Sequence, residues 1–303
     1  MEQFKISVEN FDLEETMTCG QTFAWHRING ELYSDGAEDQ GSSEEGESSP
    51  ESPDPHFYTF KDGKPIVVEE KEGELHVKTE ASRETVEQVL GLNHDLEEIF
   101  ETFPEDENLK KAKEELWGLR IVQDDFFPCL VSYLCSPQMR IPRIKQMHNR
   151  IAEEFGETVE FDEHKLLRFP TLEELSEASE DDLRDLGVGY RAKYIVESIK
   201  IMQDGFRPDF PEDYEASREK MKELYGVGDK VADCVLLFSQ EQLEAYPIDT
   251  WAMKAIKSQY PELHSEDYDE LSRNMRSYFG EYSGYAQEYI FHAARNGIIE
   301  VGE

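Results

Sequence analysis

The sequence lacks the features that would place it in a membrane or in an oxidising compartment. None of its apolar runs approaches the roughly 20 residues that a membrane-spanning helix needs. The first residues, Met-Glu-Gln-Phe-Lys, lack the basic start and apolar core of a secretory signal. The four cysteines, Cys19, Cys129, Cys135 and Cys234, are scattered and form no C-x-x-C pair. We therefore expect a cytoplasmic protein with reduced thiols and with neither structural zinc nor an iron–sulfur cluster.

Basic residues are also scarce. The 303 residues include 31 Lys and Arg against 68 Asp and Glu, a formal net charge of −37. Composition alone therefore argues against nucleic acid as a partner, because phosphate contacts favour basic proteins. The alternative is adaptation to very high salt, where surface carboxylates keep a protein hydrated and charges are screened within about 3 Å. That interpretation predicts a salt-accumulating prokaryotic cytoplasm, with basic residues kept only at the functional site. The other interpretation is an acidic protein that never meets DNA.

The order of the expected elements indicates an α+β fold. Residues 1–105 predict a small antiparallel β-containing domain, and residues 106–303 predict a mostly α-helical body. Short strands are expected over 4–8, 23–27, 56–60, 65–68 and 74–78, with hairpin turns at Asn29-Gly30, Asp62-Gly63 and Glu72-Gly73. The acidic, low-complexity stretch 36–55 predicts a disordered loop between two of these strands.

From about residue 106 the apolar spacing becomes helical. Helices are expected over 109–119, 126–135, 141–155, 171–178, 181–186, 191–202, 217–224, 230–238, 250–259, 266–279 and 285–296. Thr171 with Glu174 forms the pattern of a capping box, and Ser217 is a second plausible helix start.

One segment carries most of the chemical information, the stretch LYGVGDKVADC over 224–234. It predicts a glycine hairpin at Gly226 and Gly228, where glycine reaches φ > 0 without steric cost, followed by an apolar helix whose N-terminus can bind a phosphate. Lys230 lies in the first turn of that helix, and Asp249 follows nineteen residues later in YPIDTW. A phosphate grip, a nucleophilic lysine and a carboxylate together suggest an enzyme that removes a base from DNA. The plainer alternatives are an exposed helix lysine and an N-cap aspartate.

This segment resembles the helix-hairpin-helix signature of the HhH-GPD DNA glycosylase superfamily, and within it 8-oxoguanine DNA glycosylase/AP lyase. Four further segments resemble that family in its order: GQTFAW (20–25), CS with IPRI (135–136 and 141–144), LGVGYRAKY (186–194) and YAQEYIF (285–291). The resemblance implies excision of 8-oxoguanine opposite cytosine from double-stranded DNA through a lysine Schiff base and β-elimination, in base excision repair. It implies no cofactor and no metal in the chemical step, and a monomer is the default.

The resemblance assigns catalysis to Lys230 and Asp249. It places a base pocket at Gly20, Gln287, Phe291 and Cys234: the Gly20 carbonyl would accept from the proton that 8-oxoguanine carries at N7, Gln287 would read the pairing edge, and Phe291 and Cys234 would sandwich the flipped base. Without the family, Cys234 and Phe291 would be ordinary core residues.

The resemblance also assigns residues to the duplex. These are Gln138, Arg143, Tyr190, Arg191, Gly226 and Gly228, with Tyr190 as an aromatic wedge and the arginines on the unpaired cytosine. Carbonyls of the glycine hairpin would suit a monovalent cation. Arg140, Arg143 and Lys145 form a local basic cluster that strengthens the DNA interpretation, although a surface ion-pair face is the alternative.

Three positions depart from the family pattern. Gln138 stands where an asparagine is usual, Trp251 where histidine is frequent, and Ala294 where a carboxylate is expected. They leave Lys230 and Asp249 untouched. Two other functions stay open: an alkylpurine-type DNA glycosylase of the same fold, which generally works without a catalytic lysine, and a non-catalytic helix-hairpin-helix module, which needs neither catalytic residue.

We expect the protein to be halophilic. Raising potassium chloride from about 0.1 M to about 2 M should raise its thermal unfolding midpoint, because salt screens the repulsion among its carboxylates. An uncharged osmolyte at matched osmolality is the control. A protein that folds and acts best at low salt would contradict the interpretation.

Overall fold

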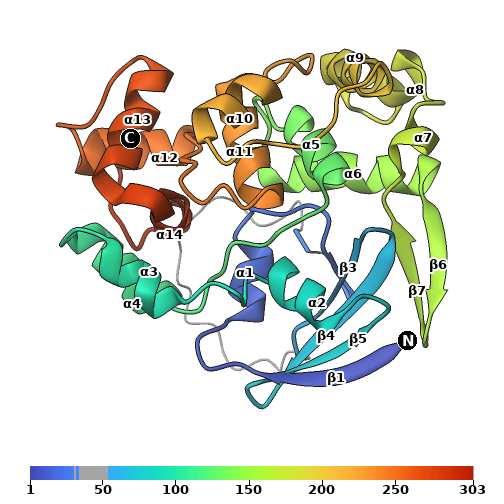
Figure 1. Ribbon diagram of the computed structural model, residues 1–303, viewed down its shortest axis with the longest axis horizontal. Helices are drawn as coiled ribbons and strands as arrows, with labels where there is room; N and C mark the ends of the chain where they lie inside the picture. The colour runs from blue at the N-terminus through green and yellow to red at the C-terminus, as the bar shows by residue number, and fades with distance from the viewer. Residues whose placement is uncertain (31, 34–53, 303) are drawn as a thin grey trace.

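The computed structural model describes residues 1–30, 32–33 and 54–302, and it has the predicted α+β architecture (Figure 1). A five-stranded antiparallel sheet has the order β1-β5-β4-β3-β2 and lies against a mostly helical body. Its strands are β1 (Glu2–Ser7), β2 (His26–Arg27), β3 (His56–Lys61), β4 (Lys64–Lys71) and β5 (Glu74–Thr79). The predicted loop 36–55 joins the neighbouring strands β2 and β3, and its residues 36–53 lie outside the described part of the chain.

The hairpin turns follow from local chemistry. Asp62-Gly63 and Glu72-Gly73 both have positive φ at their two residues, the backbone that a tight two-residue hairpin requires. They set the register of β3 with β4 and of β4 with β5. In β5 the side chains alternate, so that Leu75 and Val77 enter the core of the sheet.

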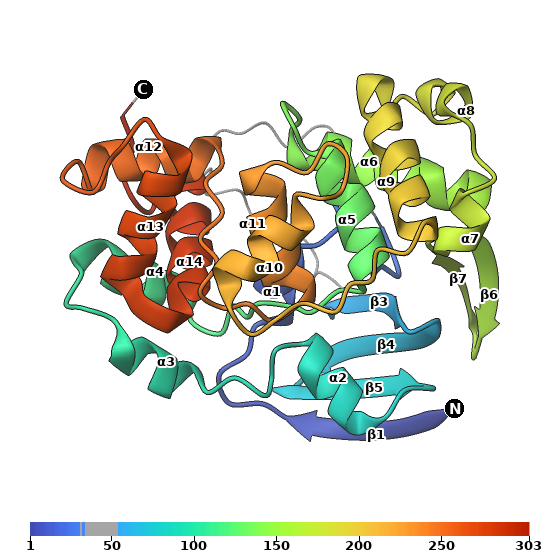
Figure 2. The same cartoon turned by 45° about the horizontal axis from the view of Figure 1, so that its top comes forward.

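The first three helices are short. They are α1 (Leu13–Thr18), α2 (Arg83–Val89) and α3 (Leu96–Thr102). Helices α1 and α2 bury apolar residues in the core of the sheet, whereas α3 packs into the core of the helical body. The body contains α4 (Glu107–Leu116), α5 (Phe126–Cys135), α6 (Ile141–Phe155), α7 (Leu172–Leu175), α8 (Glu180–Asp185), η1 (Gly189–Arg191), α9 (Ala192–Gln203), α10 (Tyr214–Met221), α11 (Asp229–Ser239), α12 (Thr250–Gln259), α13 (Tyr268–Phe279), η2 (Gly280–Tyr282) and α14 (Ser283–Arg295). Figure 2 shows α5 and α11 side by side at the centre of the body. Among the described residues, no helix is both long and apolar enough to span a membrane.

Several expectations need correction. Helices α1, α2 and α3 were not predicted, because they are only six or seven residues long and are held by caps at Asp12, Ser82 and Asp95 more than by apolar spacing. The helix expected from Ser217 starts earlier, because Asp213 accepts from the backbone of Ala216 and caps α10. The capping box at Thr171 is confirmed. The boundary predicted at residue 105 stays a prediction.

Two further differences concern strands. The strand expected over 23–27 shrinks to His26–Arg27, because the residues before it are bonded to side chains instead of to a neighbouring strand. An unpredicted hairpin, β6 (Glu157–Phe161) with β7 (His164–Arg168), interrupts the helical body. It is held by Phe161 and Leu166, which pack against residues of β3 and β4.

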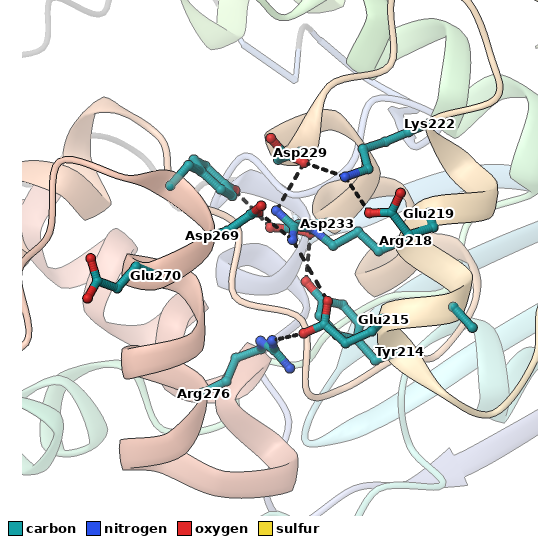
Figure 3. A network of polar contacts seen from close by, with 12 residues as sticks. Tyr214, Glu215, Arg218, Glu219, Lys222, Asp229, Asp233, Asp269, Glu270 and Arg276 are labelled. Atoms are coloured by element: carbon teal, nitrogen blue, oxygen red, sulfur yellow. Dashed lines mark hydrogen bonds and ion pairs between the residues drawn. The ribbon is translucent and has the colours of Figure 1, made fainter.

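A buried polar network joins three helices (Figure 3). The Arg218 guanidinium of α10 lies 2.9 Å from Asp233 of α11 and 2.7 Å from Asp269 of α13. The hydroxyls of Tyr214 and Tyr268 donate to the same Asp233 carboxylate at 2.6 and 2.8 Å. Burial raises the pKa of Asp233 to about 6, while Arg218 works in the opposite direction. Tyr268 also accepts from the backbone N–H of Ile248 at 3.1 Å, so the network reaches the residue before Asp249.

Removing the cation of this network should destabilise the fold. We expect Arg218→Met to cost about 3–5 kcal/mol of unfolding free energy in urea titration, because Asp233 would stay buried without its charged partner. The control is Arg184→Met in an exposed i,i+4 pair with Glu180, which should cost no more than about 0.5 kcal/mol. Equal losses in the two variants would contradict this role.

Candidate active site

A cleft of about 1050 Å³ opens in the helical body and collects residues that lie far apart in the sequence. Its walls come from the strap after α1, the α5–α6 connection, the glycine hairpin with α11, the segment before α12, and α14. Among its lining residues are Gly20, Ser136, Gln138, Gly226, Gly228, Lys230, Cys234, Asp249, Gln287, Glu288 and Phe291. Arg143, Tyr190 and Arg191 do not line it.

The strap, residues 18–25, has one carbonyl without a donor in the described part of the chain, and it belongs to Gly20, which lines the cleft. Every other carbonyl of the strap accepts a hydrogen bond: Arg295 donates to Thr18 and Cys19, Tyr133 to Gln21, Tyr33 to Thr22, Lys145 to Phe23 and Trp25, and Thr59 to Ala24. Within the described residues, no donor reaches the Gly20 carbonyl. Gly20 has φ +107°, and a Cβ there would lie 2.5 Å from Ile141 Cδ1, so glycine is required. The strap is therefore a rigid turn with a single unused acceptor.

Lys145 does not belong to the surface basic cluster that the sequence predicts. Its side chain is only 4% exposed and donates to the carbonyls of Phe23 and Trp25 at 2.8 and 2.7 Å. Burial lowers its pKa to about 7. Arg140 is exposed and Arg143 is half-buried, so only these two remain near the surface. The helical spacing of α6 explains the difference, because it turns Lys145 inward beside the buried Ile144.

The glycine hairpin needs only one left-handed residue. Gly226 has φ +85°, and a Cβ there would lie 2.4 Å from the ring of Tyr194. Gly228 has φ −99°, which any residue can adopt, so positive φ was wrongly expected there. In the described part of the chain, no atom lies within 4 Å of the point that a Cβ at Gly228 would occupy, and no side chain caps the N-terminus of α11 that it begins. A phosphate could therefore approach the first N–H groups of α11.

Lys230 and Asp249 line the same cleft from different elements. Lys230 Nζ donates to Ser136 Oγ at 3.1 Å and lies 5.1 Å from the ring centroid of Tyr133. Asp249 caps α12 by accepting from the backbone of Ala252 at 2.8 Å. Burial raises the pKa of Asp249, and the nearby Lys230 works against that shift. The capping role and a catalytic role are compatible, because the cap fixes the carboxylate in place.

The walls beside this pair suit a flat base. Cys234 is one turn after Lys230 on α11, and burial raises the pKa of its thiol to about 12, so the thiol is neutral. Gln287 and Phe291 are one turn apart on α14 and are 4% and 7% exposed. Among the described residues, the Gln287 Oε1 atom has no hydrogen-bond partner. The structure thus brings the four predicted base-pocket residues, including Gly20, into one cleft.

Of the predicted duplex-contacting residues, Gln138, Gly226 and Gly228 line the cleft, whereas Arg143, Tyr190 and Arg191 do not. Tyr190 is 45% exposed, and Gln138 is exposed with φ +57°. Arg191 is buried, its Nε donates to the carbonyl of Pro137 at 3.1 Å, and its guanidinium lies over the Tyr190 ring. In this state it supports the turn before Gln138 and the Tyr190 ring, and its contact with cytosine stays a prediction, as do the other DNA contacts.

Sequence reasoning missed two exposed hydrophobic residues at this face, Met139 and Tyr225. Apart from Met1, the exposed large hydrophobic side chains of the described chain are Met139, Tyr190 and Tyr225. Met139 directly follows Gln138 and Tyr225 directly precedes Gly226, and that adjacency was the available signal. Trp251 and Ala294 are two of the three positions that depart from the family pattern. The Trp251 ring centroid lies 4.9 Å from the Lys254 amine, and Ala294 is buried. Trp251 and Ala294 therefore form no polar pair with each other.

The charge of the cleft differs from that of the whole chain. Its lining includes the basic residues Arg140, Lys230, Lys254 and Lys257 and the acidic residues Asp229, Asp249 and Glu288. Basic side chains therefore outnumber acidic ones here, whereas acids outnumber bases by 68 to 31 in the full sequence. Over residues 1–30, 32–33 and 54–302, no three His, Cys, Asp or Glu side chains form a group that could hold a metal ion.

Comparison with known proteins matches this geometry. Residues 3–130 match the family model of the 8-oxoguanine DNA glycosylase N-terminal domain, and residues 131–281 match that of the HhH-GPD superfamily base excision DNA repair proteins. A probable N-glycosylase/DNA lyase of Methanothermobacter thermautotrophicus is 31% identical over 98% of this chain and 97% of its own length. The N-glycosylase/DNA lyase OGG1 of Arabidopsis thaliana is 31% identical over 65% of this chain and 58% of its own length.

A solved structure supports the same family assignment. The 8-oxoguanine glycosylase/lyase of Clostridium acetobutylicum, in complex with double-stranded DNA containing cytosine opposite 8-oxoguanine, has a TM-score of 0.79 and 29% identity. The similarity covers 96% of this chain and 94% of that one. The chain belongs to the 8-oxoguanine DNA glycosylase family of the HhH-GPD superfamily of base excision DNA repair proteins.

Proposed function

We propose that this protein is a bifunctional N-glycosylase/DNA lyase that excises 8-oxoguanine opposite cytosine from double-stranded DNA in base excision repair. One observation carries the proposal: Lys230 and Asp249 line the same cleft as Gln287, Phe291, Cys234 and the unused carbonyl of Gly20. The protein would act as a monomer in a salt-rich prokaryotic cytoplasm, close to the nucleoid.

Lys230 supplies the nucleophile. Its amine, once neutral, attacks C1′ of the flipped nucleotide, and the Nζ–C1′ bond forms as the bond to the base breaks with its electron pair leaving on the base. The positive charge that develops on the sugar lies near the Asp249 carboxylate, which stabilises it. Opening of the sugar ring gives a Schiff base, and loss of a 2′ proton then expels the 3′ phosphate. Ser136 Oγ, 3.1 Å from Nζ, holds the amine toward the cleft.

Gly20 supplies discrimination between 8-oxoguanine and guanine. The lesion carries a proton at N7, whereas guanine presents a lone pair there. The free Gly20 carbonyl would gain a hydrogen bond only from the lesion, and the strap cannot easily turn it away because the carbonyls on both sides are bonded. A flipped base would then lie between Phe291 and Cys234.

The two alternative functions account for less of this cleft. An alkylpurine glycosylase that works through an aspartate and water leaves Lys230 without a role. A non-catalytic module uses the hairpin as a phosphate grip but needs neither Lys230 nor a base-sized cleft. DNA binding itself is supported by the basic lining and by the open N-terminus of α11.

Lys230→Gln tests the nucleophile. We expect borohydride trapping on a duplex with 8-oxoguanine opposite cytosine, in molar potassium chloride, to give a covalent adduct with the wild type and none with the variant, while duplex binding persists. Unchanged strand cleavage by the variant would overturn the lysine mechanism. Base release without an adduct in the wild type would favour a water-using glycosylase.

Asp249→Asn tests the carboxylate. Asparagine can still cap α12, so the unfolding midpoint should change little. The single-turnover rate of base release should fall by about 10²- to 10⁴-fold, because the charge that faces the sugar is lost. A large fall in the midpoint, or a rate within about threefold of the wild type, would show that Asp249 serves the fold alone.

A further inference from the structure

Glu288 is a buried carboxyl in the wall of the cleft that the proposed mechanism does not use. It follows Gln287 on α14, lines the cleft and is 2% exposed. Among the described residues, its Oε1 atom has no hydrogen-bond partner. Burial raises the pKa of Glu288 to about 7, so its carboxylate form is accessible at neutral pH.

The groups that face Glu288 come from three elements. The Cys19 thiol of the strap contacts it, Arg295 of its own helix attracts it, and Asp249 repels it. Arg295 is itself bonded to the carbonyls of Thr18 and Cys19. Glu288 therefore lies beside the strap, and its Oε1 atom has no hydrogen-bond partner in the described part of the chain.

Two unsatisfied acceptors come from consecutive residues of α14, and both residues line the cleft. Gln287 Oε1 and Glu288 Oε1 are both buried and both without a partner in the described part of the chain. A buried acceptor left unpaired costs about 1–3 kcal/mol, so two unpaired acceptors in consecutive residues call for an explanation. A ligand edge with two neighbouring donors would satisfy both.

The pairing edge of a guanine-type base has that arrangement. It presents an acceptor at O6, a donor at N1 and a donor at the exocyclic N2 amine. Adenine places an acceptor at N1, and hypoxanthine lacks the N2 amine. The Gln287 amide can donate to O6 and accept from N1–H. A carboxylate oxygen beside it can accept from the N2 amine.

We propose that Glu288 is a base-reading residue that accepts a hydrogen bond from the N2 amine of the flipped base, beside Gln287. The assignment rests on the proposed function and deepens it. The Glu288 carboxylate recognises a guanine-type base by its N2 amine, and the Gly20 carbonyl recognises the oxidised form by its N7 proton. The carboxylate gives a charge-assisted bond, which is stronger than one to an amide.

The test compares two bases that differ only in the amine. Base release is measured by single-turnover kinetics on duplexes with 8-oxoguanine or 8-oxohypoxanthine opposite cytosine. We expect Glu288→Gln to lower kcat/KM for 8-oxoguanine about 10- to 100-fold and for 8-oxohypoxanthine less than about threefold. Strand cleavage at a preformed abasic site, which has no base to read, should stay within about twofold. Glu281→Gln, at an exposed position, is the matched control.

The outcomes separate the two proposals. Equal losses on both bases, or an equal loss at the abasic site, would overturn the base-reading role and leave Glu288 as a support for Cys19. If the variant fails to fold, the wild type decides: it should prefer 8-oxoguanine over 8-oxohypoxanthine by at least about tenfold, and equal rates would overturn the proposal. A wild type that cleaves abasic duplexes yet releases no 8-oxoguanine would overturn the proposed function itself.

Discussion

The arrangement of the cleft depends on the buried Asp233 carboxylate and its partners. Asp233 lies on the helix that carries Lys230 and Cys234, and Tyr268 joins it to the backbone of Ile248, next to Asp249. Lys230 and Asp249, the proposed nucleophile and its carboxylate partner, are thus positioned by one network with Arg218 at its centre. A buried ion pair of this kind contributes modest net stability but penalises any arrangement that separates its members. That property suits a site whose two reacting groups come from separate segments.

The strap before β2 obeys a second constraint, the need to satisfy buried carbonyls without a partner strand. Side chains from α5, α6, α14 and β3 do this, and Lys145 and Arg295 each donate to two carbonyls. The exception is the Gly20 carbonyl, to which no donor of the described chain is bonded and which is the proposed acceptor for the lesion. Because its neighbours are fixed, the free acceptor has a defined direction, and recognition does not need a large rearrangement of the strap.

The large negative charge and the affinity for DNA are reconciled by where the charges lie. The cleft keeps a small excess of basic side chains, while the excess of carboxylates lies elsewhere in the chain. At high ionic strength the Debye length is about 3 Å, so a carboxylate more than a few ångströms from the duplex repels it weakly. Local contacts, such as a phosphate at the N-terminus of α11, then matter more than net charge.

The sequence by itself determined the α+β class, the two positive-φ hairpin turns, the helix that follows the glycine hairpin and the candidates Lys230 and Asp249, because each depends on local backbone chemistry or on short motifs. It did not determine the short helices α1, α2 and α3, whose caps are not accompanied by a long apolar pattern, or the β6–β7 hairpin, which is held by packing against β3 and β4. Only the tertiary structure decided that Lys145 supports the strap and that Arg191 is turned inward. It also decided that the Gly20 carbonyl and the Oε1 atom of Glu288 have no hydrogen-bond partner within the described chain. Whether a polar group has a partner is fixed by residues from other elements, and spacing along the chain carries no record of them.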